Sequence, residues 1–232
     1  MLYRMYVELS KPGSFATVET CLHDLDSPVG QHNLRADAFP DFQPEFYPMA
    51  LSDDSSLVDL VDVGGAVGGD GLMVSEKVLG ILERMKLPPY QPYRVALTHR
   101  GRPVTDRYFW LQILALDNYG WIDFGKSQFT LKSHLDPDFD AEGEPVQIGS
   151  ERELKSIIES KGGDFFIFYR KLTLNSGYAR SPFDLFYFDR LGGVRSGYPI
   201  VSDRLKAAFD SAQVAGYALR ELQEVVIDER RS

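Results

Sequence analysis

The chain has 232 residues, of which 44% are hydrophobic and 12% aromatic, so it can bury a substantial core and lacks the composition of a disordered protein. This length fits one large domain or two small ones. The formal net charge of −9 has the opposite sign to that of most nucleic-acid-binding domains, and no apolar run approaches the ~18 residues of a membrane span, which argues against a nucleic acid or a membrane as partner.

The sequence also disfavours export. Cys21 is the only cysteine, so no intramolecular disulfide can form, as is usual in a reducing compartment. The first nine residues read as a strand and lack the long apolar core of a signal peptide. We therefore expect a cytoplasmic protein.

Hydrophobic spacing predicts several strands and three clear helices, with a fourth, short helix over residues 15–25. The strands are expected at 3–9, 93–98, 107–116, 128–132, 165–174, 185–189 and within 217–227, and the helices at 76–85, 151–160 and 203–212. Since strands and helices do not alternate regularly, we expect an α+β fold with a mixed or mainly antiparallel sheet, rather than a doubly wound sheet.

The first and third clear helices form an internal repeat. Residues 74–90 match residues 201–217 with a constant offset of 127. Each copy begins with a serine that can cap the helix, Ser75 or Ser202, followed by an acid and then by an apolar stripe. A tyrosine and a strand follow each helix, so the repeated unit is a buried helix that returns into a strand.

The second helix has its own start and stop signals. Ser150 and Glu153 have the spacing of a capping box, and Gly162 and Gly163 can end the helix. Before this helix lies an acidic segment, residues 136–144, with five acids, a proline and a glycine. It either joins two lobes, 1–135 and 145–232, or is a long loop within a single domain spanning residues 1–232.

The negative charge is concentrated in one third of the chain. Residues 12–76 contain 12 acids and a single base, Arg35, a net charge of −11, whereas the rest contains 22 acids and 24 bases. Such a region either attracts a basic partner electrostatically or simply keeps the surface soluble.

Motifs of catalysis, cofactor binding and metal binding are incomplete. The four histidines, His23, His32, His99 and His134, have no zinc-ligand spacing. The glycine-rich segment 64–71 lacks the lysine of a phosphate-binding loop, and no nucleophile motif is present. We therefore expect a protein that is not an enzyme, with no catalytic residue, cofactor or metal.

Three motifs in a fixed order resemble those of the Imm11 (DUF1629) family, the immunity proteins of bacterial polymorphic toxin systems. They are Val-Ser-Glu-Lys at 74–77, the aromatic segments 108–113 and 121–127, and residues 200–206 together with 215–217. The resemblance covers residues 45–222 and departs from the family at the Pro88-Pro89 turn. It implies a protein that binds and neutralises a cognate secreted toxin, through the toxin's C-terminal domain, by direct contact and without catalysis.

The residues that contact the toxin must be inferred from physics, because no family motif assigns them. Toxins that act on nucleic acids present basic clefts, which an acidic surface complements. Tyr119, Trp121 and Tyr178 lie beside glycine or serine and are expected to be exposed, and tyrosine and tryptophan are common binding anchors. The predicted toxin-binding residues are Asp53, Asp54, Asp59, Asp136, Asp138 and Asp140, with Tyr119 or Trp121 as the anchor.

Two other functions remain open at this point. An enzyme whose site assembles only in the fold would have a deep pocket with converging polar groups. An adaptor module of a secretion system would bind a partner unrelated to any toxin. The sequence does not determine the oligomeric state.

Overall fold

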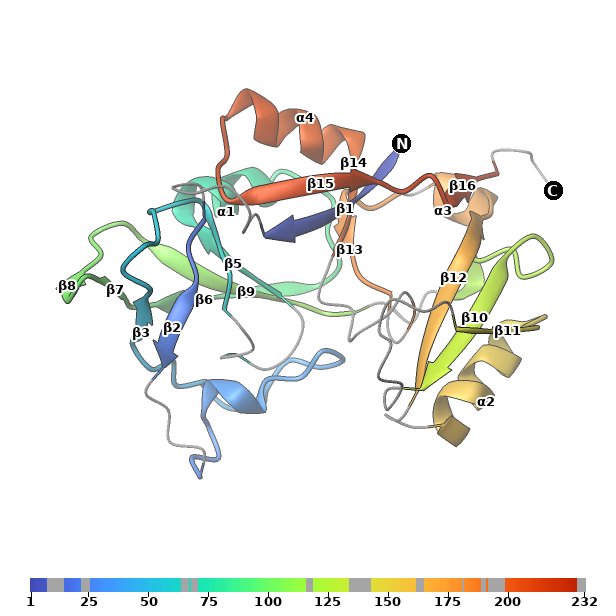
Figure 1. The fold of residues 1–232 in the computed structure, drawn as a ribbon, viewed down its shortest axis with the longest axis horizontal. Coiled ribbons are helices and arrows are strands. Elements are labelled where there is room, and N and C mark those ends of the chain that lie inside the picture. The colour runs from blue at the N-terminus through green and yellow to red at the C-terminus, as the bar shows by residue number, and fades with distance from the viewer. Residues whose placement is uncertain are drawn as a thin grey trace.

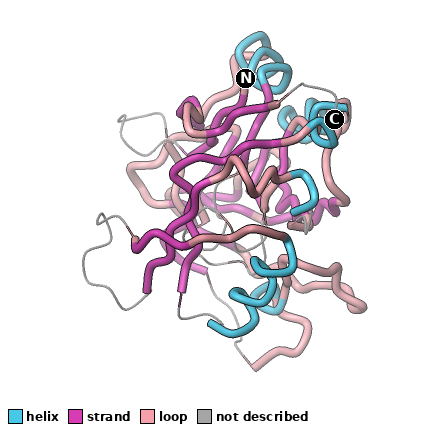
Figure 2. Tube along the Cα trace, turned by 90° about the vertical axis from the view of Figure 1, so that its right-hand side faces the viewer, coloured by secondary structure: helices cyan, strands magenta, loops and turns pink. Residues whose placement is uncertain are grey.

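The computed structural model describes residues 1–7, 15–21, 26–63, 67, 71–115, 119–133, 143–161, 165–180, 182–188, 191 and 199–228. These residues form an α+β fold in which strands fill the middle and helices lie on the periphery (Figures 1 and 2). The helices are α1 (Glu76–Leu82), α2 (Glu151–Lys161), α3 (Ser176–Arg180) and α4 (Asp203–Ser211), with two 3-10 turns at Gln31–Asn33 and Tyr119–Trp121. None of the described helices is long and apolar enough to cross a membrane.

The described strands form four sheets of four strands, which we name by position. The first inner sheet is β4 (Leu60–Val61), β5 (Gly71–Ser75), β9 (Tyr108–Ile113) and β6 (Tyr90–Val95), in that order. The second inner sheet is β13 (Leu185–Phe186), β14 (Ile200–Ser202), β1 (Leu2–Val7) and β15 (Tyr217–Glu221).

The two outer sheets lie at opposite ends of the molecule (Figure 1). The first outer sheet is β2 (Val18–Cys21), β3 (Met49–Leu51), β7 (Leu97–His99) and β8 (Arg102–Pro103). The second is β11 (Glu144–Val146), β10 (Gln128–Ser133), β12 (Phe165–Leu174) and β16 (Val225–Ile227).

The predicted α+β class and the three clear helices are confirmed, and most predicted strands are found with shifted ends. The helix predicted at 15–25 is wrong within the described residues, because Val18–Cys21 forms β2 and pairs with β3. The capping box of α2 is shifted by one residue: the Glu153 N–H donates to the Ser150 hydroxyl at 3.2 Å, but the Glu153 carboxylate accepts from the Gly149 N–H.

The repeat extends over the whole of both inner sheets, which have the same strand order and the same register. The pair Leu60–Val74 of the first sheet matches Leu185–Val201 of the second. In the same way, Val74–Phe109 matches Val201–Tyr3, and Tyr90–Ile113 matches Tyr217–Val7. In the second sheet, β1 therefore takes the place that β9 takes in the first. The last strand of the second copy comes from the beginning of the chain.

The outer sheets repeat as well. In each unit, the strand that follows the edge strand of the inner sheet joins the outer sheet by a parallel pairing. Strand β7 follows β6 and pairs with β3, and β16 follows β15 and pairs with β12. In each, β3 or β12 also pairs antiparallel with an earlier strand, β2 or β10. We name residues 15–113 the first unit, and residues 119–228 with β1 the second unit.

The acidic segment 136–144 lies in the sequence between two strands of the second outer sheet. The strands on either side of it, β10 and β11, pair antiparallel, with Leu131 opposite Glu144. The boundary considered between lobes 1–135 and 145–232 falls between these two strands of one sheet, with the segment at the same place in the chain. Of its residues, only Gly143 and Glu144 are described.

Three clusters form the core. The central cluster lies between the inner sheets and the helices α1 and α4, and includes Met5, Val78, Leu111, Val201 and Phe209. The other two clusters each join one inner sheet to the outer sheet of the same unit. The two units are thus held together by the burial of apolar side chains on facing sheets and helices.

The predicted serine caps are present at both repeated helices. The Ser75 hydroxyl accepts a hydrogen bond from the Val78 N–H, and the Ser202 hydroxyl accepts one from the Leu205 N–H. Each serine thereby satisfies one of the free N–H groups at a helix start, as expected from the sequence.

Each capping serine is held in turn by an aspartate of a neighbouring strand or turn. The Ser75 hydroxyl donates to Asp59 Oδ1 at 2.7 Å, and the Ser202 hydroxyl donates to Asp184 Oδ1 at 2.8 Å. The backbone N–H of each serine also donates to the backbone carbonyl of the same aspartate. These four hydrogen bonds fix the angle between each helix and the strand before it.

The second carboxylate oxygen of each aspartate reaches into the other unit. Asp59 Oδ2 accepts a hydrogen bond from the Ala215 N–H, after α4, at 2.9 Å. Asp184 Oδ2 accepts one from the Lys86 N–H, after α1, at 2.8 Å. The two aspartates therefore form a reciprocal lock, in which each unit caps its own helix and binds the end of the other.

A basic residue at the second position of each helix completes the lock. Lys77 Nζ lies 2.7 Å from the Asp59 carboxylate, and Arg204 pairs with Asp184. Lys77 also donates to the Gln213 carbonyl, at the end of α4, at 3.2 Å. The charge on each aspartate, whose side chain is 15% or 7% exposed, is thus balanced by a basic side chain that itself reaches solvent.

Removing one half of the lock should destabilise the whole protein. Asp184→Ala leaves a serine hydroxyl, an arginine and a backbone N–H without their acceptor, so we expect a loss of about 2–4 kcal/mol in unfolding free energy. Asp210→Ala removes an exposed acid of α4 and should cost no more than about 1 kcal/mol. Urea unfolding of both variants checks this, and equal losses would contradict the lock.

Acid should weaken the lock in a defined direction. Burial raises the pKa of Asp59 and of Asp184, but their hydrogen bonds and ion pairs outweigh it and hold each pKa below its ordinary value. The unfolded chain therefore binds more protons than the folded chain, and the unfolding free energy should fall as the pH drops from about 5 to about 3. Asp184→Asn cannot titrate, so the same urea series should show a shallower fall for this variant.

Candidate partner-binding surface

Asp53 and Asp54 lie on an exposed turn that follows β3, within residues 52–57, which we name the acidic turn. The turn is closed by a hydrogen bond from the Ser55 N–H to the Ser52 carbonyl at 3.0 Å. The two serine hydroxyls lie 2.7 Å apart, and Ser55 is buried. The serines therefore face inward and the two carboxylates face solvent.

The acidic turn is anchored from two sides. The Thr17 N–H donates to the Ser55 hydroxyl at 3.1 Å, and the Ser56 N–H donates to the Phe15 carbonyl at 2.8 Å. On the other side, Arg100 Nε donates to the Asp53 carbonyl at 3.0 Å. A surface that is fixed before binding loses less conformational entropy when a partner docks.

Leu57 adds an apolar side chain to this surface. It is 47% exposed, and among the described residues Met1 and Val226 are the other two large hydrophobic residues classed as exposed. The next residue, Val58, is buried, and its carbonyl accepts a hydrogen bond from the Tyr108 hydroxyl at 2.8 Å. Sequence reasoning missed Leu57, although a leucine between serines and acids, outside any periodic pattern, was the available signal.

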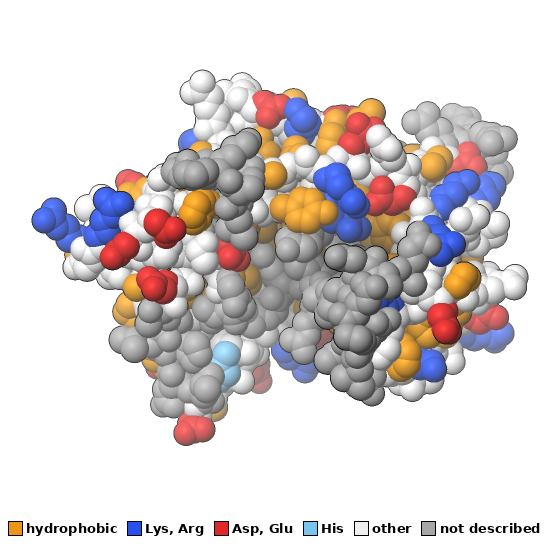
Figure 3. Space-filling model, in the orientation of Figure 1, with side chains coloured by type: hydrophobic (Ala, Val, Ile, Leu, Met, Phe, Trp, Pro, Cys, Tyr) orange, Lys and Arg blue, Asp and Glu red, His pale blue; other side chains and the backbone are white. Residues whose placement is uncertain are grey.

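The fold cancels part of the charge of residues 12–76. Asp37 pairs with Arg35 at 2.6 Å, Asp59 with Lys77, and Glu76 with Arg107. Acidic and basic side chains are accordingly mixed at the end of the molecule formed by the first outer sheet (Figure 3). Within the described part of the chain, Asp53 and Asp54 take part in no ion pair, and neither do the exposed Glu19, Asp41 and Glu45, so the acidic turn carries two adjacent acids of the charge that remains unbalanced.

Several predicted contact residues lie elsewhere or serve the core. Asp59 belongs to the lock between the units, and its side chain is only 15% exposed, which leaves little of it for a partner to contact. Tyr119 and Tyr178, predicted to be exposed, are buried at 2% and 1%. Asp136, Asp138 and Asp140 lie outside the described residues.

Trp121 is half-buried and belongs to an aromatic cluster. Its ring lies 5.4 Å from Tyr178, 5.6 Å from Phe183 and 6.2 Å from Phe186, measured between centroids. These edge and tilted contacts are those of a packed core. Its indole is held in this cluster, so Trp121 is not a free anchor.

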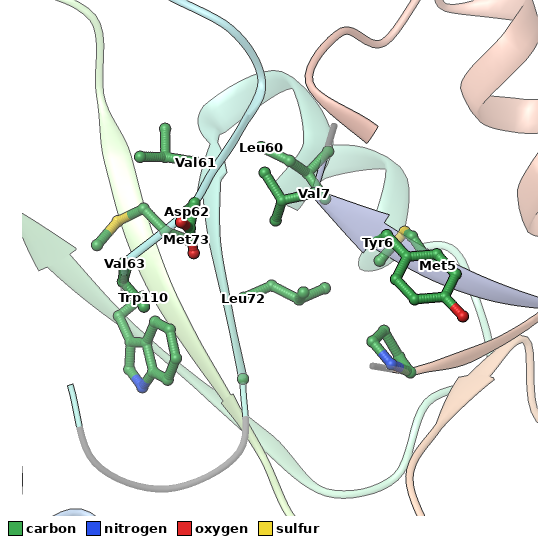
Figure 4. Close-up of a pocket in the computed structure, with 12 residues that line it drawn as sticks. Met5, Tyr6, Val7, Leu60, Val61, Asp62, Val63, Leu72, Met73 and Trp110 are labelled. Atoms are coloured by element: carbon green, nitrogen blue, oxygen red, sulfur yellow. The ribbon is translucent and has the colours of Figure 1, made fainter. Parts of the chain in front are cut away.

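A cavity of about 130 Å³ opens where the two units meet (Figure 4). It is mainly apolar, and Leu72 and Pro199, which occupy matching positions of the repeat, both line it. Asp62 and Tyr6 are its titratable lining residues among those described. One carboxylate and one phenol do not by themselves make a catalytic pair, and the described residues hold no group of three potential metal ligands.

No protein-family model matches the chain, and a search of curated proteins finds no match. The resemblance to the immunity family therefore rests on its motifs alone. In the structure, residues 74–77 and 200–206 form the two capped helix starts, and residues 108–113 form β9. These motif residues serve the repeat and the core, and they do not identify an interface.

The anchoring of the acidic turn can be tested through Ser55. Ser55→Ala leaves the Thr17 N–H without its acceptor, so we expect a loss of about 1–2 kcal/mol in unfolding free energy and faster amide exchange at Thr17. Ser156→Ala, on an exposed face of α2, is the matched control and should change neither quantity. Unchanged exchange at Thr17 in Ser55→Ala would contradict the anchor.

Proposed function

We propose that this protein is an immunity protein that binds and neutralises a cognate secreted bacterial toxin by direct contact, in the cytoplasm of the cell that makes the toxin. The motif resemblance supports the class. The acidic turn is the observation that carries the interface, because it combines a fixed backbone, two unpaired carboxylates and an exposed leucine. It replaces the wider acidic surface expected from the sequence.

The chemistry of the turn favours a basic partner with an apolar recess. Asp53 and Asp54 attract a positively charged cleft over several ångströms, which accelerates association. Leu57 then leaves water on contact, which slows dissociation. A toxin that acts on nucleic acids or nucleotides presents such a cleft, and covering it blocks substrate access without any reaction by the immunity protein.

The two contributions should separate kinetically. We expect Asp53→Asn combined with Asp54→Asn to slow association about tenfold at low salt, with a smaller effect at high salt. Leu57→Ser should instead speed dissociation about tenfold. The measurement is stopped-flow or biosensor kinetics with the C-terminal domain of a candidate toxin, which is to be sought among secreted proteins encoded by adjacent genes.

The matched control removes two exposed acids from the opposite end of the molecule, through Glu144→Gln and Glu159→Gln. If this pair slows association as much as the Asp53 and Asp54 pair does, net charge matters and the acidic turn is not the interface. Calorimetry with the unaltered chain tests the function itself. Nanomolar one-to-one binding that suppresses toxicity supports immunity, and no binding to this domain contradicts it.

A further inference from the structure

Strand β15 is an edge strand of the second inner sheet, with β1 on one side only (Figure 1). In its pairing with β1, Ala218 lies opposite Tyr6 and Arg220 opposite Arg4, and the Leu222 N–H donates to the Leu2 carbonyl at 3.0 Å. Backbone groups alternate in direction along a strand, so those of residues 218, 220 and 222 point toward β1. Those of Tyr217, Leu219 and Glu221 point to the open side.

The open side of β15 has no backbone partner in the part of the chain that the structure describes. A row of N–H and C=O groups along a strand edge is a template for pairing with another chain. Side chains on one face of the strand already pack on the core, because Tyr217 and Leu219 join the central cluster. The edge is therefore held rigidly while its backbone remains available.

The repeat supplies an internal comparison. Strand β6 occupies the same edge position in the first inner sheet, and its Pro92 matches Leu219 of β15. Proline has no N–H and is a common way to keep an edge strand from pairing. The first unit thus has no N–H at this place of its edge, whereas the Leu219 N–H of the second unit has no backbone partner among the described residues.

The charges beside β15 define what fits there. Arg4 and Arg220 stand directly opposite each other, and like charges in this position repel. Arg4 donates to the Tyr169 hydroxyl at 2.8 Å and has no carboxylate partner among the described residues, while Arg220 pairs with Glu224 at 2.9 Å. A carboxylate on a strand added at the open side of β15 would lie opposite Arg220. The row across the three strands would then be an acid, Arg220 and Arg4.

We propose that β15 binds an extended acidic segment of a partner protein by strand addition. The partner's backbone bonds to Tyr217, Leu219 and Glu221, and its acidic side chain lies beside Arg220. The residues on either side of that acid face Leu219 and Glu221, and the one that faces Leu219 is apolar. This surface is separate from the acidic turn, and the proposal does not depend on the partner being a toxin.

The test is an NMR titration of the isotope-labelled chain with a capped peptide, Thr-Val-Thr-Val-Glu-Val-Thr-Ser, up to millimolar concentration. We expect the largest amide shifts at Tyr217, Leu219 and Glu221, with slowed hydrogen exchange there. The same peptide with lysine in place of glutamate should bind about three- to fivefold more weakly. Absence of shifts at these amides, or equal binding of both peptides, would overturn the proposal.

Two variants separate strand addition from other modes of binding. Leu219→Pro removes the central N–H as Pro92 does in β6, so it should abolish the shifts while the rest of the spectrum stays folded. Arg220→Glu should reverse the preference and favour the lysine peptide, a gain that an unfolded variant does not show. Shifts that survive Leu219→Pro, or a peptide-free dimer paired through β15, would show a different site or a different occupant.

Discussion

The structure depends on the contact between two aspartate carboxylates and the starts of two helices. Asp59 and Asp184 each hold a capping serine of one unit and a backbone N–H of the other. A buried carboxylate is costly unless its oxygens are fully bonded, and here the required donors come from both units. Neither aspartate is therefore satisfied unless the two units are docked, which makes the docking cooperative.

The N-terminal strand β1 belongs to the second unit because the second inner sheet needs it. An inner sheet needs a strand between its helix-bearing strand and its edge, and β9 fills this place in the first unit. The chain of the second unit continues from β15 into β16 and supplies no such strand, so β1 fills the gap with the same register. This contact joins residues about 200 positions apart, which favours slow folding through non-local pairing.

The helices and their caps could be predicted from residues close together in the sequence, but the lock formed by Asp59 and Asp184 could not. The Ser75 and Ser202 caps follow from residues adjacent in sequence, and the constant offset of 127 marked them. Asp59 and Asp184 are separated by 125 residues, so the repeat loses its register before it reaches them. Asp59 also sits in an acidic stretch, where composition suggested solvent exposure, and only its three donors show that it is structural.

Burial was the hardest property of the candidate site to predict. Gly120 and Gly177 suggested turns that expose their aromatic neighbours. Tyr119 and Tyr178 are nevertheless core residues, one in a 3-10 turn and the other in α3. The acidic turn behaves in the opposite way, since hydrogen bonds from distant backbone hold it outward. Which side of a turn faces water depends on long-range partners, which a single sequence does not specify.

The two units have the same strand order and register but differ in side chains at matching positions. These differences help to separate residues that maintain the fold from residues that are available for function. Where the first unit has Trp110 in the core, the second has Arg4, and where the first has Pro92, the second has Leu219. Matching positions that kept their type, such as Val74 and Val201, carry the fold. The side chains that both units share at matching positions are those that the repeated fold needs for stability. Positions where one unit has a charged side chain or an N–H that the other lacks are those where binding can be selected without loss of stability.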